Sequence, residues 1–164
     1  MFCGMDTTVI HLKTHEETLA LGRVLATVLC KTDPIPRVLL NGPLGAGKTT
    51  LVRGLATQLP GGGQAEVASP SFNIVNLYPT TPETAHFDLY RLEGMGLDDD
   101  LLDLLEDEHI LALVEWPEHL PEHLVPDNRL EITLAIPETG RTATLTASPP
   151  AQYCLEDIVQ KYNT

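Results

Sequence analysis

The chain has 164 residues and a formal net charge of −13, from 10 Lys and Arg against 23 Asp and Glu. A chain of this length builds one domain around a single core, so we expect residues 1–164 to form one unit, without an independent substrate domain. Phosphate contacts dominate the affinity of proteins for nucleic acid. The acidity therefore argues against direct binding to RNA or DNA and favours a protein partner.

Cysteine spacing and hydropathy indicate a reduced cytoplasmic protein. Cys3, Cys30 and Cys154 are far apart and form no C-x-x-C pair, so neither a disulfide framework nor a zinc site is expected. No apolar run approaches the roughly 20 residues that cross a bilayer, and the first residues lack the basic start of a signal peptide. We expect a cytoplasmic chain with no membrane contact.

The first third of the chain alternates predicted strands and helices. Residues 9–12 predict a strand, and the capping-box sequence Thr14-His-Glu-Glu17 predicts the start of a helix. The apolar run at residues 37–41 predicts a short buried strand. A helix is expected over 49–59, because apolar residues recur there at helical spacing. A glycine-rich break at 59–64 separates this helix from the next elements.

The middle of the chain predicts a hairpin and an acidic helix. Residues 72–78 and 85–90 are rich in β-forming residues and predict two neighbouring strands. An amphipathic helix follows, and its Asp98–Asp100 run fits a solvated first turn, which the helix dipole favours, better than a metal site.

The last third completes an α/β pattern. Residues 110–114 form a continuous apolar run that stops at Glu115, as a central parallel strand does. Residues 130–136 and 142–146 predict a closing antiparallel hairpin, and 151–162 predict a final helix. The expected fold is a mostly parallel central sheet flanked by helices, with antiparallel strands added.

A phosphate-loop motif lies between the predicted strand at 37–41 and the helix at 49–59. The sequence Gly42-Pro-Leu-Gly45-Ala-Gly47-Lys48-Thr49 fits G-x-x-x-x-G-K-[ST]. In this motif, glycines let backbone N–H groups point at a phosphate, and the helix N-terminus adds partial positive charge. Lys48 is expected to reach the β- and γ-phosphates, and the Thr49 hydroxyl to bind magnesium. The residues expected to contact the nucleotide here are Leu44, Gly45, Ala46, Gly47, Lys48, Thr49 and Thr50.

Two carboxylates are candidates for the side of the magnesium ion opposite the loop. Glu115 follows a buried strand, and ligands of such sheets bind beyond the carboxyl ends of strands, so we expect it to bind magnesium. The alternative is an ordinary exposed acid at a strand end. Asp88 lies between two apolar residues, where an unpaired charge would be costly. It is expected to orient the attacking water, act as base or hold the ion through water; the alternative is a structural pair with Arg91 or His86.

Three further residues have open roles. Ser71 lies in a hydroxyl-bearing loop where phosphate-loop hydrolases often place a switch that senses the γ-phosphate, and it would serve equally well as a plain turn residue. Trp116, the only tryptophan, fits packing as well as contact with a ligand or partner. His86 fits a hydrogen-bonded core histidine better than a metal ligand.

Other nucleotide-binding classes fit less well. A GTPase needs an N-K-x-D motif after the phosphate loop, and the nearest string, Cys30-Lys-Thr-Asp33, precedes the loop and lacks the Asn. A small-metabolite kinase needs a cationic lid over the transferred phosphate. The basic residues after the loop form no cluster in the sequence: Arg53, Arg91, Arg129, Arg141 and Lys161.

Three strings together resemble the bacterial TsaE (YjeE) family: GPLGAGKTT at residues 42–50, SPSF at 69–72 with HFDLYRL at 86–92, and VEWPE at 114–118. Their order matches too, and the likeness covers most of the chain. The resemblance implies a small ATPase of the phosphate-loop class that uses ATP and Mg²⁺. It would work with TsaB and TsaD homologues in making threonylcarbamoyladenosine in tRNA, with tRNA held only indirectly through that complex.

The resemblance also implies roles for individual residues. Lys48 and Thr49 would contact phosphate and magnesium, Glu115 would be the Walker-B-like acid, and Asp88 a second acid needed for hydrolysis. Ser71 stands where the family usually has Thr, which keeps the hydroxyl and loses a methyl group. In the loop, Pro43 replaces a more usual acidic residue. The adenine is expected between His15 and Arg141.

The sequence therefore predicts an ATPase that turns over slowly alone and is coupled to a protein complex that handles tRNA. Two alternatives remain. One is a small-metabolite kinase, and the other is a nucleotide-dependent adaptor that changes conformation without meaningful hydrolysis.

Overall fold

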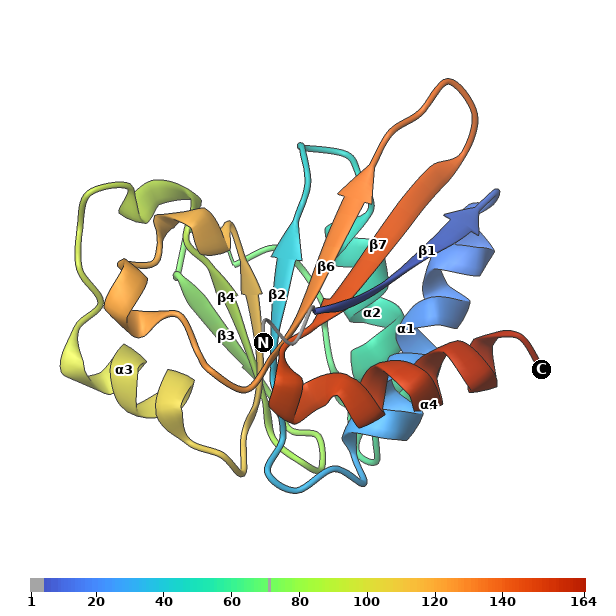
Figure 1. Ribbon diagram of the computed structural model, residues 1–164. Helices are drawn as coiled ribbons and strands as arrows, with labels where there is room; N and C mark the ends of the chain where they lie inside the picture. Colours follow the sequence, from blue (N-terminus) through green and yellow to red (C-terminus); the bar gives the residue numbers. More distant parts are fainter. Residues whose placement is uncertain (1–4, 71) are drawn as a thin grey trace.

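The computed structural model describes residues 5–70 and 72–164 and contains a seven-stranded sheet (Figure 1). Along the sheet the strands follow the order β1-β7-β6-β2-β5-β4-β3. Their bounds are β1 Asp6–Leu12, β2 Arg37–Asn41, β3 Val75–Tyr78, β4 Thr84–Asp88, β5 Leu111–Glu115, β6 Arg129–Ala135 and β7 Arg141–Ala147.

The centre of the sheet is parallel, and its edges are antiparallel. Strand β2 pairs in parallel with both β5 and β6, and β5 pairs in parallel with β4. Antiparallel strands are added on both sides, β3 on β4, β7 on β6 and β1 on β7. The expected α/β fold with a mostly parallel centre is confirmed. The carboxyl ends of the parallel strands meet at one edge of the sheet, where ligands of such folds bind.

Helices cover the two faces of the sheet unequally. Helices α1 His15–Leu29, α2 Lys48–Gln58 and α4 Gln152–Tyr162 lie on one face, and α3 Asp99–Glu106 lies on the other (Figure 1). Successive strand residues point to opposite faces, so in β2 Val38 and Leu40 pack into the core under α1 and α2, whereas Leu39 packs into the core on the α3 side. Strand β2 is therefore buried on both faces, which explains its continuous apolar run.

Helices α1 and α2 approach each other closely through glycine. A Cβ atom added to Gly22 of α1 would lie 2.4 Å from the carbonyl oxygen of Leu51. A Cβ atom added to Gly54 of α2 would lie 2.3 Å from the carbonyl oxygen of Leu19. Only glycine permits this backbone contact, which fixes α2, and with it the loop that precedes α2, against the rest of the core.

Several predicted boundaries shift by a few residues. The first strand starts at Asp6 rather than residue 9, and the strand predicted at 72–78 starts at Val75. The reason for the second shift is local: Asn73 and Ile74 donate backbone bonds back to the Pro70 carbonyl, and Ile74 has a φ of 65°. Its partner strand ends at Asp88 rather than residue 90.

The expected helix starts are observed. Thr14 is the N-cap of α1, and its hydroxyl accepts a hydrogen bond from the backbone N–H of Glu17. The Glu17 carboxylate accepts in return from the backbone N–H of Lys13. Asp98 caps α3 in the same way, accepting from the N–H of Leu101, so the acidic run is the first turn of a helix.

Within residues 5–70 and 72–164, no helix is long and apolar enough to cross a bilayer.

Candidate functional site

The phosphate-loop sequence forms a turn between β2 and α2. Gly47 is the N-cap of α2 with a φ of 106°, a left-handed conformation that favours glycine, and the helix begins at Lys48. Gly45 also has a positive φ, and a Cβ added there would meet no atom within 4 Å. The loop therefore presents open backbone at the N-terminus of an 11-residue helix, where the helix dipole favours an anion.

The Lys48 side chain is folded back over this loop. Its ammonium group donates to the carbonyl oxygen of Gly42 and, at 3.2 Å, to that of Pro43. The ammonium nitrogen also lies 4.6 Å from the centre of the Trp116 ring, in a cation–π contact. Burial lowers the pKa of Lys48 below its usual value, while the nearby carboxylates of Glu115 and Asp88 act in the opposite direction. A bound anion would offset the cost of burying this charge.

Asp88 and Glu115 meet at the carboxyl end of the sheet. Each is the last residue of its strand, and the two are paired in the parallel register of β4 and β5. Glu115 is only 3% exposed, so the alternative of an ordinary exposed acid is wrong. Both carboxylates line a cavity of about 280 Å³ together with the phosphate loop. The cavity is lined by Pro43, Leu44, Gly45, Ala46, Gly47, Lys48, Thr49, Thr50, Ser69, Asp88, Glu115 and Trp116.

Asp88 is held by the loop that precedes β3 and by the turn that follows β4. One carboxylate oxygen accepts from the hydroxyl of Ser69 at 2.8 Å, and the other accepts from the backbone N–H of Tyr90 at 3.0 Å. Among the residues described, no ion pair joins Asp88 to Arg91 or His86, so that alternative is wrong. A carboxylate has about four lone-pair positions, and these two bonds leave acceptor capacity for a ligand or water.

Glu115 is hydrogen-bonded to a fully buried histidine. The Oε1 atom of Glu115 lies 2.8 Å from Nε2 of His86, and Nδ1 of His86 lies 2.9 Å from the hydroxyl of Tyr78. Burial raises the pKa of Tyr78 above its usual value. His86 is thus the hydrogen-bonded core histidine that its place in a strand predicts.

Trp116 directly follows Glu115 in an unusual backbone conformation. Its φ and ψ are 58° and 49°, in the left-handed region that a bulky residue rarely occupies. The ring packs against Tyr90, with centroids 5.0 Å apart, and faces Lys48. Trp116 therefore packs and lines the cavity at once. Strained residues of this kind concentrate at functional sites.

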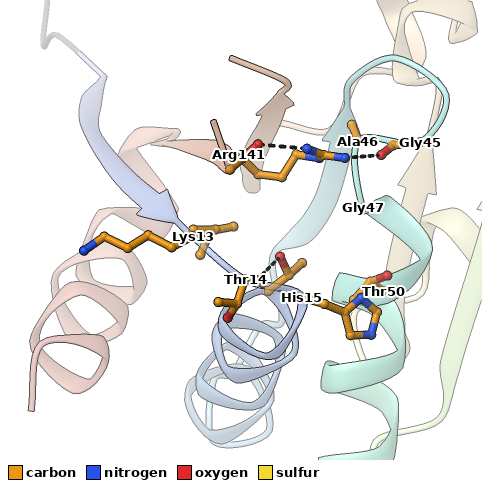
Figure 2. A pocket seen from close by; sticks show the side chains of 11 residues that line it. Lys13, Thr14, His15, Gly45, Ala46, Gly47, Thr50 and Arg141 are labelled. Carbon is orange, nitrogen blue, oxygen red and sulfur yellow. Dashed lines mark hydrogen bonds between the residues drawn. The ribbon is translucent and has the colours of Figure 1, made fainter. Parts of the chain in front are cut away.

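A second cavity adjoins the first on the other side of the loop. It has a volume of about 230 Å³ and shares Gly45, Ala46, Gly47 and Thr50 with the first. Figure 2 shows that His15, at the start of α1, lies beside Thr50, and that Arg141 points from β7 toward the loop. The guanidinium of Arg141 donates to the carbonyl oxygen of Gly45 at 3.3 Å and to that of Gly140 at 2.8 Å.

The structure thus brings the predicted loop residues and both acids around one cavity, and His15 and Arg141 around the adjoining one. Ser71 lies outside the described residues. Sequence reasoning gave no role to Ser69 or to Tyr78. The only signal for Ser69 was a hydroxyl two residues before Ser71, and nothing in the sequence indicated that Tyr78 would contact His86.

The oxygen donors at this site fit magnesium that is shared with a phosphate ligand. The Thr49 hydroxyl and the carboxylates of Asp88 and Glu115 are hard oxygen donors that line the same cavity. Within the described part of the chain, no group of three or more His, Cys, Asp or Glu side chains could hold a metal alone. Magnesium is commonly bound by one or two carboxylates together with substrate phosphates and water, which is what this donor set could provide.

Comparison with known proteins gives one consistent family. Residues 12–143 match the family described as threonylcarbamoyl adenosine biosynthesis protein TsaE. A tRNA threonylcarbamoyladenosine biosynthesis protein TsaE from Streptomyces coelicolor is 44% identical over 127 residues, covering 73% of this chain and 81% of that protein. The TsaE protein of Rickettsia felis is 32% identical over 153 residues, covering 91% of this chain and 85% of that protein.

A solved structure supports the same relationship. The crystal structure of Bacillus subtilus YdiB superimposes with a TM-score of 0.76 at 25% sequence identity. The match covers 96% of this chain and 97% of that chain. The resemblance seen in the three sequence strings is therefore confirmed over most of the chain.

Proposed function

This chain belongs to the TsaE family, whose role is in tRNA threonylcarbamoyladenosine biosynthesis, and we propose that it acts there by binding ATP with magnesium and hydrolysing it. The observation that carries the proposal is the cavity in which the phosphate loop, Lys48 and two buried carboxylates face one another.

The loop and Lys48 would hold the phosphates. Backbone N–H groups of the loop would bind the phosphates at the N-terminus of α2, which favours an anion. Lys48 donates to the carbonyl oxygens of Gly42 and Pro43, and it would turn from these toward the β- and γ-phosphates. The nucleoside would extend into the adjoining cavity, which His15 and Arg141 both line.

The acids would complete the site for hydrolysis. Thr49 and Glu115 would hold magnesium, which when bound neutralises charge on the β- and γ-phosphate oxygens. Asp88 would orient the attacking water through its unused acceptor capacity and take up its proton. Ser69 and the backbone N–H of Tyr90 keep that carboxylate aimed into the cavity. We keep Ser71, as a γ-phosphate-sensing switch, in this proposal on sequence grounds alone.

The charge of the chain and its family support the proposed coupling to partners. With a net charge of −13 this chain is poorly suited to hold tRNA itself, so the RNA would be held by other proteins. The partners we propose are TsaB and TsaD homologues in the cytoplasm. ATP hydrolysis by this chain would reset or drive their complex between rounds of modification.

Reconstitution tests this proposal. The purified chain is mixed with ATP, magnesium, TsaB and TsaD homologues and tRNA, and both ATP hydrolysis and multiple-turnover tRNA modification are measured. We expect slow hydrolysis by the chain alone, faster hydrolysis in the complex, and loss of both readouts in Lys48→Ala. ATP consumption that rises only with an added alcohol or acid acceptor would favour the alternative function of a small-metabolite kinase. If tRNA modification is retained in Asp88→Ala but lost in Lys48→Ala, the result would favour the alternative of a nucleotide-dependent adaptor without meaningful hydrolysis.

A further inference from the structure

A buried chain of polar groups adjoins Glu115. His86 is fully buried in the centre of β4, and its Nε2 atom lies 2.8 Å from the Glu115 carboxylate. An ionised carboxylate only accepts hydrogen bonds, so Nε2 must carry the hydrogen and donate it. A buried carboxylate without such a donor would be costly, and the hydrogen bond from His86 offsets that cost.

Tyr78 determines which histidine nitrogen carries the hydrogen. Its hydroxyl has one hydrogen and lies 2.9 Å from Nδ1 of His86 and 3.3 Å from the carbonyl oxygen of Ala68. Burial raises the pKa of Tyr78, so this hydroxyl keeps its proton and can donate it. Donation along the shorter contact makes Nδ1 the acceptor and leaves the hydrogen on Nε2, the nitrogen that faces Glu115.

Both supports lie close to one short segment. The Tyr78 hydroxyl lies 3.3 Å from the carbonyl oxygen of Ala68, and the next residue, Ser69, donates to Asp88 at 2.8 Å. Because the single hydrogen of the Tyr78 hydroxyl goes to His86, Ser69 supports Asp88 directly, and His86 supports Glu115 without a hydrogen bond from this segment.

We propose that His86 is a positioning residue for Glu115, and that Tyr78 fixes the tautomer in which His86 can do this. The inference rests on the proposed function, because the task of Glu115 is to hold magnesium beside the nucleotide. Partners that orient a metal-binding side chain typically affect metal affinity or activity about 10- to 100-fold when they are removed. His86 itself does not line the cavity, so it acts through Glu115.

Paired substitutions at residue 86 test the role. In His86→Gln, the amide nitrogen reaches close to the place of Nε2 and can still donate to Glu115. In His86→Asn and His86→Leu that donor is lost. We expect His86→Asn and His86→Leu to lower kcat, or to raise the magnesium concentration needed for half-maximal hydrolysis, by about 10- to 100-fold. ATP binding measured in EDTA should stay within about twofold of wild type, and His86→Gln should recover most of the loss. His109→Asn, at an exposed histidine in the turn before β5, is the matched control.

A readout that needs no nucleotide tests the tautomer. In ¹H–¹⁵N correlation spectra of the histidine rings, the signals lost in His86→Gln identify His86. We expect hydrogen on Nε2 in wild type and an altered ring spectrum in Tyr78→Phe. Circular dichroism shows whether each variant folds. If the residue 86 variants do not fold, Tyr78→Phe is used in their place to test the contact with His86.

The outcomes separate the two proposals. If wild type hydrolyses ATP and folded His86→Asn and His86→Leu match it in kcat and magnesium dependence, the positioning role is overturned while the proposed function stands. Hydrogen on Nδ1 of His86 would overturn the role of Tyr78. A wild-type chain that neither binds nor hydrolyses ATP would overturn both proposals.

Discussion

Asp88 and Glu115 end two neighbouring parallel strands and lie opposite each other in their register. Like charges so placed repel, yet each has its own support: Ser69 and Tyr90 donate to Asp88, and His86 donates to Glu115. The separate supports indicate separate tasks, and the two acids should therefore differ in how they respond to substitution.

Asp88→Asn should separate binding from hydrolysis. The amide keeps the shape of the side chain but is a poor proton acceptor, so we expect kcat to fall about 100-fold or more while the ATP dissociation constant changes less than about threefold. Calorimetric titration with ATP and single-turnover hydrolysis measure the two quantities. Equal losses in both would mean that Asp88 serves binding instead.

The affinity for ATP should fall as the pH rises toward the pKa of Lys48. Burial has lowered that pKa, and phosphate binding favours the charged ammonium, so the protein should take up protons when it binds ATP. The decline should begin at a lower pH than for an ordinary lysine. Titrations over roughly pH 7 to 10, in pairs of buffers with different ionisation enthalpies, measure both effects. Affinity that stays constant over this range would contradict the expectation.

Trp116 should report nucleotide binding by its fluorescence. It is the only tryptophan, and its ring lies 4.6 Å from the Lys48 ammonium, which would move toward phosphate when ATP binds. We expect the emission to change saturably with ATP and magnesium in wild type and not in Lys48→Ala. Emission that follows ATP equally in both proteins would show that Trp116 does not sense Lys48.

Gly54→Ala should destabilise the fold. The added methyl group would lie 2.3 Å from a backbone oxygen of α1, so the two helices must separate. We expect a loss of about 1–3 kcal/mol in the free energy of unfolding, as for other overpacked sites. Thermal or urea unfolding measures it. Gly63→Ala is the matched control, because a Cβ there would meet no atom within 4 Å, and an equal loss in both would contradict the helix contact as the cause.

Much of the fold followed from local patterns. The apolar run before Glu115 and the capping box at Thr14 each determine structure through neighbours in sequence, and the observed β5 and α1 match them closely. Ile74 shows the limit: β-forming composition predicted a strand, and backbone bonds to Pro70 turned the chain instead. Amino-acid composition alone does not predict such a turn.

The candidate site was predictable where a motif defines it and not where the fold assembles it. The phosphate loop was expected from the spacing of its motif, and Glu115 from its place after an apolar run. Asp88 was singled out by its place between two apolar residues, inside a predicted strand that in the structure ends at Asp88. The contact of Tyr78 with His86 depends on the pairing of β3 with β4, and the bond from Ser69 to Asp88 depends on how a loop folds back over the sheet. Neither is encoded in the spacing of residues along the chain.

The most direct test of the central claim is a ¹H–¹⁵N amide spectrum recorded while ATP and magnesium are added. We expect the amide signals of residues 45–49 to shift saturably, with larger changes than those of α4, because the backbone N–H groups of the loop bind phosphate. Lys48→Ala should weaken the response strongly. If millimolar ATP with magnesium leaves these amide signals in place, the loop is not a phosphate site and the proposed function is wrong.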